Sequence, residues 1–377
     1  MKYFLIAGEA SGDLHAAGLI EALRKHDADA SFVGLGGDRM QAAGCRLYQH
    51  YRKMAYMGYM AVITHLGDIC RTSRITQQAL LHEQPDELIL IDYPGFNVRI
   101  AEFCRKHLPN TRVTYFIPPK VWAWKRWRIH SIGKNCHHIL GIFPFEPSFY
   151  AKYGYTCSYV GNPVVQTVSA YIQSVSENGE IKGNEEPYIA LLPGSRSQEI
   201  EHCLHKMIEA TELALQAFPA INRIVVTTAP GIDPSYYQRF INGYSMVELR
   251  SDTYNVVRNA AAAVVNSGTA TLETALLDCP QVAVYHLAFG HLVQLLRPII
   301  FQIPYFTLVN IVAGREVIRE LLTTDFTIEG VRDELCRLLA NADYVANMRK
   351  GYADVRRILG LSSAADTAAK IITSDLK

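Results

Sequence analysis

The sequence predicts an α/β protein of two nucleotide-binding-type domains that face each other across a cleft, each with a mostly parallel sheet. Three observations lead to this prediction. Short apolar runs of strand type alternate with segments of helical periodicity along the chain. This pattern occurs twice, and the polar stretch 174–187 separates the two halves. In the second half, small-residue turns open helices directly after strands, and such turns are typical phosphate-binding elements.

The first half opens as a βαβ unit whose first turn is acidic. An apolar strand at 3–7 leads into a loop at 8–13 and a helix at 14–25. The loop lacks the glycine spacing of a dinucleotide-binding fingerprint. Glu9 makes it a poor phosphate cradle, so we expect it to accept hydrogen bonds from sugar hydroxyls instead. The other elements expected in this half are strands at 30–34, 88–91, 113–116, 139–143 and from 159, and a short helix at 145–150.

Asp92 directly follows the expected strand 88–91 and precedes a Tyr-Pro-Gly turn. Ligands of open α/β sheets bind beyond the carboxyl ends of the strands. An aspartate at this position either caps the following turn or faces the cleft as a base. The local pattern leaves both roles open.

The second half contains a predicted anion site at Gly194, Ser195 and Arg196. An apolar strand at 188–192 precedes these residues, and a helix follows them, with Ser195 as its expected N-cap. The first amides of a helix lack internal partners and carry partial positive charge. Gly194 allows a phosphate to approach the backbone, and Arg196 adds a permanent planar cation.

A second small-residue turn, Ser267, Gly268 and Thr269, opens another expected helix, which carries Glu273 one turn later. The strands expected around these two turns lie at 224–228, 264–265 and 281–285. Together with the two α/β halves and the linker, these two helix openings predict two facing nucleotide-type domains with a cleft between them.

Length and composition limit the class of protein. A chain of 377 residues is too long for one core, so we expect domains at 1–163 and 164–345 and closing helices at 346–377 that pack back on the first domain. A net charge of +1 does not favour nucleic acid as a partner. The 8 cysteines form no C-x-x-C pair, which indicates a reduced cytosolic protein without a metal site.

Two segments allow alternative interpretations. Residues 54–70 carry Met, Tyr, Val, Ile and Leu side chains between Lys53 and Arg71, which fits either a buried helix or a membrane-facing patch. All 3 tryptophans lie at Trp122, Trp124 and Trp127 among four cations. Such a segment can pack inside, stack on sugars or bases, or lie at a lipid headgroup layer.

Seven motifs in order resemble the lipid-A-disaccharide synthases, a family of inverting glycosyltransferases with two Rossmann-like domains in the GT-B arrangement. The resemblance covers nearly the whole chain, at residues 7–13, 34–40, 91–97, 121–124, 191–199, 267–273 and 310–316. Pro119-Lys120 and Gly161-Asn162-Pro163 depart from the family pattern. Lys120 and Asn162 therefore inherit no role from it.

The resemblance implies transfer of 2,3-diacylglucosamine from its UDP derivative to 2,3-diacylglucosamine 1-phosphate. The products are a β-1,6-linked disaccharide 1-phosphate and UDP, and no cofactor or metal is implied. The alternative is another UDP-sugar enzyme of the same fold, either an epimerase or a transferase with a soluble acceptor. Acylated substrates imply a cytoplasmic protein bound peripherally to the inner face of the inner membrane. Homo-oligomerisation stays possible on this reading.

The resemblance also implies roles for particular residues. Asp92 is the expected base, and Glu9 and Ser11 are expected to face the cleft from the first domain. Glu273 resembles the residue that accepts hydrogen bonds from the donor ribose. Asn310 and Arg315 lie in the family's donor-side motif.

Overall fold

The computed structural model describes residues 1–53, 66–178, 186–286 and 304–374. The chain divides into two compact units, one of Met1–Pro163 with Leu361–Lys377 and one of Val164–Gly360. The boundary expected at residue 346 falls inside helix α16 (Ala342–Leu359), which belongs to the second unit.

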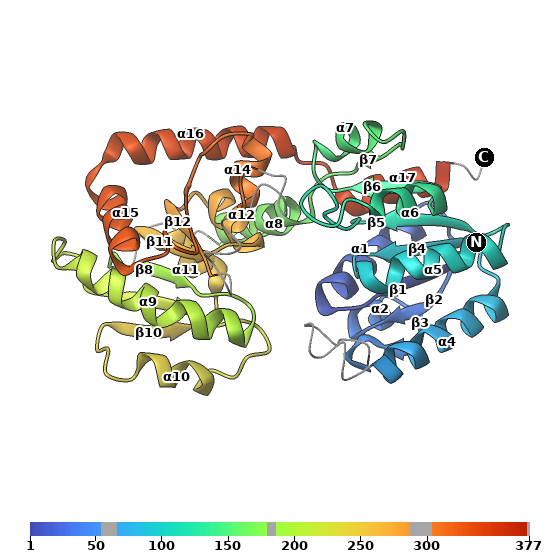
Figure 1. Ribbon diagram of the computed structural model, residues 1–377, viewed down its shortest axis with the longest axis horizontal. Coiled ribbons are helices and arrows are strands. Elements are labelled where there is room, and N and C mark those ends of the chain that lie inside the picture. Colours follow the sequence, from blue (N-terminus) through green and yellow to red (C-terminus); the bar gives the residue numbers. More distant parts are fainter. Residues whose placement is uncertain (54–65, 179–185, 287–303, 375–377) are drawn as a thin grey trace. The chain divides into compact units, whose positions relative to one another are not determined.

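The first unit contains a seven-stranded, fully parallel sheet (Figure 1). The strand order is β3-β2-β1-β4-β5-β6-β7. The strands are β1 (Lys2–Ala7), β2 (Ser31–Gly36), β3 (Arg46–His50), β4 (Glu87–Ile91), β5 (Arg112–Phe116), β6 (His138–Gly141) and β7 (Ser158–Tyr159). The helical elements are α1 (Ala10–Arg24), α2 (Asp38–Ala42), η1 (Tyr51–Lys53), α4 (Leu66–Glu83), α5 (Pro94–His107), α6 (Arg128–Asn135), α7 (Glu146–Ala151) and α17 (Ala364–Ser374).

Helices cover both faces of this sheet, so its central strands are apolar on both sides. In β1, Phe4 and Ile6 point into the core beneath α4, α5 and α6, whereas Tyr3, Leu5 and Ala7 point into the core beneath α1 and α17. Each fully buried side chain of this size contributes roughly 1.5–3 kcal/mol. This two-sided burial explains why the strands read as continuous apolar runs.

The C-terminal helix α17 completes the second of these cores. Ala368, Ala369 and Ile372 are fully buried there, and α17 lies against α1 (Figure 1). The Arg112 guanidinium donates to the Ile372 carbonyl at 3.0 Å, which ties the helix to β5.

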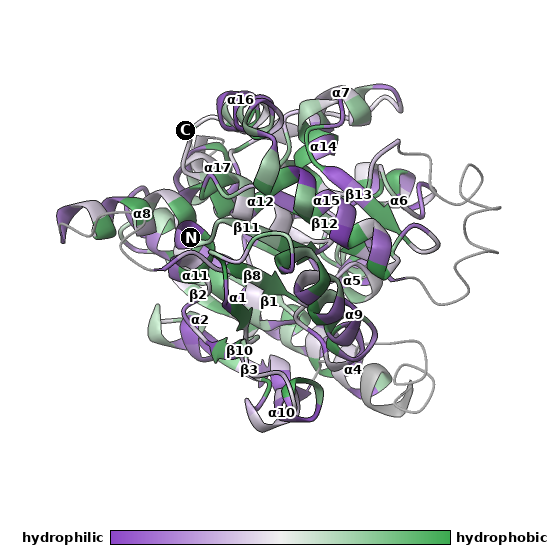
Figure 2. Ribbon diagram, turned by 90° about the vertical axis from the view of Figure 1, so that its left-hand side faces the viewer, coloured by the Kyte–Doolittle hydropathy of each residue, from purple (hydrophilic) through white to green (hydrophobic). Residues whose placement is uncertain are grey.

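The second unit contains a six-stranded parallel sheet with the order β10-β9-β8-β11-β12-β13. Its strands are β8 (Ile189–Leu192), β9 (Ile224–Thr227), β10 (Val247–Arg250), β11 (Ala262–Asn266), β12 (Gln281–Tyr285) and β13 (Arg319–Leu322). Its helices, besides α16, are α8 (Pro163–Glu177), α9 (Ser197–Leu215), α10 (Ser235–Ile241), α11 (Thr253–Asn259), α12 (Thr269–Leu276), α14 (Leu308–Ala313) and α15 (Ile328–Ala340). Figure 2 shows strands β1 and β8 in the green of apolar residues, whereas α9 and α16 carry both colours, as expected for helices with one face in solvent.

Both sheets share one doubly wound topology. In each, the first strand of the unit lies centrally and the order reverses beside it, between β1 and β4 and between β8 and β11. Loops at such a reversal diverge to opposite faces, which leaves a crevice at the carboxyl ends of the two strands. The turns that the sequence singled out follow these four strands.

Several local expectations need correction. Helix α1 begins at Ala10 rather than at residue 14, so most of the expected loop 8–13 is helical. The first four residues of the expected linker 174–187 continue α8. The expected strand 139–143 begins one residue earlier and ends at Gly141. Of the segment 54–70, residues 54–65 lie outside the described residues. No helix in the described ranges is long and apolar enough to span a membrane.

Candidate active site

The crevice of the first unit brings two acidic residues together. Strands β1 and β4 pair with Ala7 opposite Ile91. Glu9 and Asp92 follow these paired residues, so both emerge at the same point of the sheet edge. The two carboxylates interact electrostatically.

The backbone at Asp92 is held in an unusual conformation. Asp92 and Tyr93 have φ of 43° and 46°, a left-handed region that costs of order 1–3 kcal/mol per residue outside glycine. The Asp92 carbonyl accepts hydrogen bonds from the Tyr115 hydroxyl at 2.7 Å and the Asn97 amide at 2.8 Å. Both donors come from buried side chains. They hold the turn that directs the Asp92 carboxylate. Asn97 lies within the motif 91–97, but the sequence assigned no role to it or to Tyr115.

Gly8 makes room for this turn on the neighbouring strand. A Cβ atom on Gly8 would lie 2.3 Å from Cγ of Tyr93. Any side chain at position 8 would therefore displace Tyr93, and with it the turn that carries Asp92.

The environment of Asp92 favours its protonated form. Burial raises the pKa of this carboxyl to about 6, and the negative charge of Glu9 adds to the effect. The Lys120 ammonium and the Tyr93 amide act in the opposite direction. A carboxylate with a pKa near 6 is a stronger base than an exposed aspartate and is still ionised at neutral pH.

Glu9 and Ser11 are joined by a short hydrogen bond, since the Ser11 hydroxyl donates to Glu9 Oε1 at 2.6 Å. Glu9 is the N-cap residue of α1, and Ser11 lies exposed in its first turn. Asp13 is instead buried and accepts from the amides of Gly37 and Met40 at 2.7 and 3.1 Å, which fixes the start of α2. Of the acidic side chains at 8–13, Glu9 is thus the one at the crevice.

The tryptophan segment has both buried and exposed parts. Trp122 is 4% exposed, and its indole donates to Glu146 Oε1 at 3.1 Å. Burial raises the pKa of Glu146 to about 7. Trp124 and Trp127 are 43% and 69% exposed, and the Lys125 ammonium lies over the Trp124 ring. Trp122 therefore anchors the segment while the other two rings face solvent.

The crevice of the second unit begins with a tight turn after β8. Gly194 has φ of 127°, and a Cβ atom there would lie 2.5 Å from Glu199 Oε2 and 2.8 Å from Asn266 Nδ2. Only glycine fits this backbone and this space. The N-cap of α9 is Arg196, rather than the expected Ser195.

The Glu199 carboxylate occupies the expected anion position. Its Oε2 accepts from the amides of Ser195 and Arg196 at 2.9 and 3.3 Å, and its Oε1 lies 3.1 Å from Arg196 Nη1. The same two amides and the same guanidinium form the predicted phosphate cradle. The arrangement thus binds an anionic group, which in this structure is the carboxylate of Glu199.

The turn after β11 presents the second helix opening. Ser267 donates its amide to the Val284 carbonyl at 2.8 Å, Gly268 is the N-cap of α12, and Thr269 begins the helix in solvent. Glu273 accepts a hydrogen bond from the Tyr254 hydroxyl at 2.7 Å. Burial raises the pKa of the Glu273 carboxyl. Tyr254 packs edge-on against Tyr171 at 5.4 Å, so Glu273 is positioned by a residue that the motifs do not include.

Asn310 and Arg315 occupy different environments. The Asn310 side chain is fully buried, and it bonds to the Ile318 carbonyl, the Val317 amide and the Glu320 carboxylate at 2.7–2.9 Å. Arg315 is half exposed and pairs with Asp354 at 2.9 Å. Asn310 therefore shapes the segment that leads into β13, and Arg315 lies at the surface.

The described part of the chain contains no group of three His, Cys, Asp or Glu residues that could hold a metal ion.

Known structures support the fold. UDP-GlcNAc 2-epimerase from Neisseria meningitidis bound to UDP-GlcNAc has a TM-score of 0.66 and 11% identity, with 100% of this chain and 99% of that chain covered. CalG4, the calicheamicin glycosyltransferase, has a TM-score of 0.53 and 14% identity, with 100% and 98% covered. Sugar-nucleotide epimerases and GT-B glycosyltransferases thus share this architecture.

Sequence comparison is more specific. The chain is 33% identical to a lipid-A-disaccharide synthase of Trichlorobacter lovleyi over 99% of its own length and 97% of the relative. It is 34% identical to the Myxococcus xanthus enzyme of the same name, over 98% and 96%. The family model described as lipid-A-disaccharide synthetase matches residues 3–372. With both crevices and their motifs inside that match, the chain belongs to the lipid-A-disaccharide synthase family.

Proposed function

We propose that the two crevices divide the work of one glycosyl transfer. The chain is a glycosyltransferase of lipid A disaccharide formation. The second unit binds the UDP-sugar donor, and the first unit activates the acceptor hydroxyl. The donor is UDP-2,3-diacylglucosamine and the acceptor is 2,3-diacylglucosamine 1-phosphate. The observation that carries this assignment is Asp92, a strained strand-end carboxylate whose pKa burial raises to about 6.

In the proposed reaction, Asp92 takes the proton of the acceptor 6-hydroxyl. The oxygen attacks C1 of the donor sugar while the C1–O bond to the diphosphate breaks, and UDP leaves with the electron pair. Attack from the face opposite the leaving group inverts C1 and gives the β-1,6 link. Glu9, bound to Ser11, keeps the pKa of Asp92 high and accepts a hydrogen bond from an acceptor hydroxyl.

The diphosphate takes the place of the Glu199 carboxylate at the start of α9. The amides of Ser195 and Arg196 and the Arg196 guanidinium already bind an anion in that position. Donors that are fixed before the reaction stabilise the charge that develops on the leaving group. The backbone amides at the exposed start of α12, at Gly268 and Thr269, are a second set of donors to the same diphosphate.

Glu273 accepts hydrogen bonds from the donor ribose, and Tyr254 holds its carboxylate in place. A buried carboxylate with one fixed partner retains free lone pairs for two further donors. Asn310 has a positioning role, since its hydrogen bonds stay within the protein. The Arg315 guanidinium can bind the donor only if its ion pair with Asp354 breaks.

Both proposed substrates carry acyl chains, so the enzyme meets them at a membrane surface. We place the chain on the cytoplasmic side, bound peripherally. Exposed tryptophans beside cations are typical of the headgroup layer, and Trp124, Lys125 and Trp127 have this character. Residues 54–65, the other proposed contact, lie outside the described residues.

The test is release of UDP and formation of disaccharide from the two purified substrates. Asp92→Asn is expected to lower turnover at least 100-fold while UDP still binds, because the general base is lost. Asp29→Asn, a change of the same type at an exposed position of the first unit, is the control. Wild-type turnover in Asp92→Asn would refute the assignment. Conversion of the donor to its C2 epimer without acceptor would favour the epimerase alternative.

A further inference from the structure

A basic pocket opens beside the crevice of the first unit, between β3 and α4. Its volume is about 770 Å³, within the range of small-molecule sites. The described residues that line it are Gln41, Leu47, Tyr48, Gln49, His50, Arg52, Lys53, Arg71, Thr72 and Ile75. Three of these are cations and none is acidic, so this lining favours an anion.

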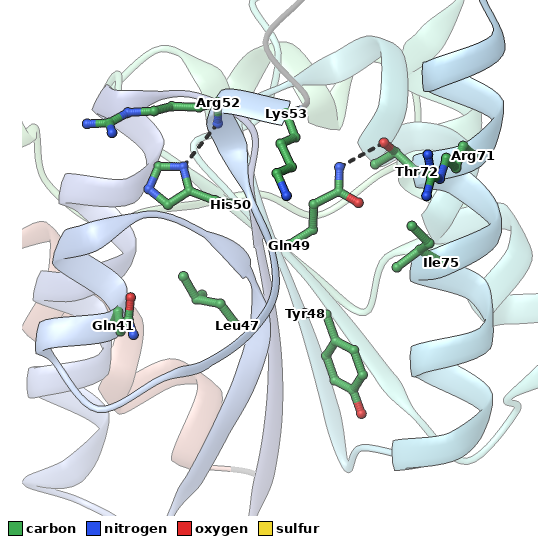
Figure 3. A pocket seen from close by; sticks show the side chains of 10 residues that line it. All are labelled: Gln41, Leu47, Tyr48, Gln49, His50, Arg52, Lys53, Arg71, Thr72 and Ile75. Atoms are coloured by element: carbon green, nitrogen blue, oxygen red, sulfur yellow. Dashed lines mark hydrogen bonds between the residues drawn. The ribbon is translucent and has the colours of Figure 1, made fainter.

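Two of the cations lie on opposite walls of the pocket. Figure 3 shows Lys53 reaching from η1 toward Gln49, with Arg71 on the facing helix α4. No hydrogen bond or ion pair joins Lys53 or Arg71 to another residue whose side chain the structure describes. Arg52 instead extends toward Asp38, at 3.4 Å. The paired cations that a ligand can use are therefore Lys53 and Arg71.

Neutral groups complete the pocket. The Gln49 amide donates to the Thr72 hydroxyl at 3.0 Å, which joins β3 to α4 between the two cations. The Tyr48 hydroxyl bonds to Glu83, so its ring, with Leu47 and Ile75, supplies apolar surface. A cationic pair above apolar carbon suits an amphiphile that carries a phosphate.

The pocket lies at the same sheet edge as Asp92. Parallel strands end together, and His50 closes β3 just as Ile91 closes β4. Three strand spacings separate β3 from β4, which is roughly 14 Å.

We propose that Lys53 and Arg71 bind the 1-phosphate of the acceptor while its 6-hydroxyl lies at Asp92. This inference rests on the acceptor assigned under the proposed function. In the acceptor, the 1-phosphate and the 6-hydroxyl leave the sugar ring from different sides, so one ligand can engage both places. The pocket then selects phosphorylated over dephosphorylated acceptor.

The test compares Lys53→Gln/Arg71→Gln with wild type. Wild type is expected to have a higher kcat/KM for the 1-phosphate acceptor than for the dephosphorylated one. The double variant is expected to lose about 10- to 100-fold of that preference, because it loses charge-assisted hydrogen bonds to the phosphate. The control is Arg105→Gln/Lys106→Gln, which removes the same charges from the exposed end of α5, at the opposite edge of the sheet. Its preference is expected to match wild type.

Two further measurements separate the sources of phosphate. Titration with glucosamine 1-phosphate needs no turnover, so it tests the pocket even if the assigned reaction fails. Wild type is expected to bind glucosamine 1-phosphate, and loss of that binding in the double variant supports the proposal. Flotation with phosphatidylglycerol vesicles is expected to be equal for both proteins. If the variant loses vesicle binding but keeps its phosphate preference, the pocket binds phospholipid headgroups and the proposal is wrong. Equal preference in variant and wild type also overturns it.

Discussion

Replacing Asp92 by asparagine should make the first unit more stable at neutral pH while abolishing its chemistry. In the folded chain, burial and Glu9 raise the pKa of this carboxyl from 3.8 to about 6. The folded state therefore binds the Asp92 proton more tightly than the unfolded state does, and ionisation at neutral pH opposes folding. An asparagine in its place would keep the size and one side-chain oxygen without the charge.

The magnitude follows from the difference of about two pKa units. One unit corresponds to 1.36 kcal/mol, so ionised Asp92 lowers the free energy of unfolding by up to about 3 kcal/mol. The sign depends on pH. Well below pH 3.8 the carboxyl is protonated in both states, and the variant gains nothing. As the pH rises from 4 to 6, wild type loses stability relative to the variant, and above pH 7 the difference is complete.

Tryptophan fluorescence measures this transition selectively, because all 3 tryptophans lie between residues 122 and 127 of the first unit. Urea denaturation at pH 4, 5, 6, 7 and 8 would give the stability difference at each pH. The exposed control Asp29→Asn is expected to follow wild type throughout. A variant that is less stable at pH 7, or whose advantage does not change with pH, would show that Asp92 is not the strained and desolvated base described here.

Other predictions address the surrounding charges. Glu9→Gln should move the acid limb of the kcat/KM profile to lower pH, because it removes an anion that acts on Asp92. Lys120→Met should move that limb to higher pH, because it removes a cation that acts on Asp92. Unchanged profiles would exclude this coupling. Glu199→Gln should tighten UDP binding several-fold in calorimetry and weaken the α9 cap by about 1 kcal/mol; weaker binding would mean that Glu199 assists the ligand. Tyr254→Phe should weaken binding of UDP more than that of 2′-deoxy-UDP, and an equal loss would remove Glu273 from the ribose. EDTA should leave transfer unchanged.

The sequence predicted the fold well because this fold leaves strong local signals. Central parallel strands are buried on both faces, so segments such as β4 and β12 appear as unbroken apolar runs. Strands β3, β10 and β13 were not anticipated. Each ends a sheet, is only partly buried and carries charged residues, so its pattern resembles a surface loop.

The motifs that the sequence singled out lie at the carboxyl ends of β1, β4, β8 and β11, because glycine turns and strand-end carboxylates are contiguous in the sequence. It assigned no role to Tyr115, Asn97 or Tyr254, although Asn97 lies within the motif 91–97. Each of these acts across the fold on a residue 5–23 positions away, through a hydrogen bond that depends on the tertiary structure. Asn310 shows the converse limit. Its place in the donor-side motif stays a prediction, whereas the contacts of its side-chain oxygen with the Val317 and Ile318 amides depend on the tertiary structure and could not be predicted.

The two crevices have one property in common that bears on how the enzyme works. In each crevice, charged or polar groups suited to binding a ligand lie in an environment that is unfavourable for them. In the first, hydrogen bonds from Tyr115 and Asn97 to the Asp92 carbonyl hold a turn whose carboxyl group is desolvated by burial. In the second, the Glu199 carboxylate neutralises the anion site, so the helix opening is never an uncompensated positive centre. In the reaction proposed above, substrate binding relieves both conditions, since an acceptor hydroxyl would give Asp92 a hydrogen-bond donor and a diphosphate would displace Glu199. On that proposal, the amides and the guanidinium that bind the leaving group are already fixed by an internal carboxylate.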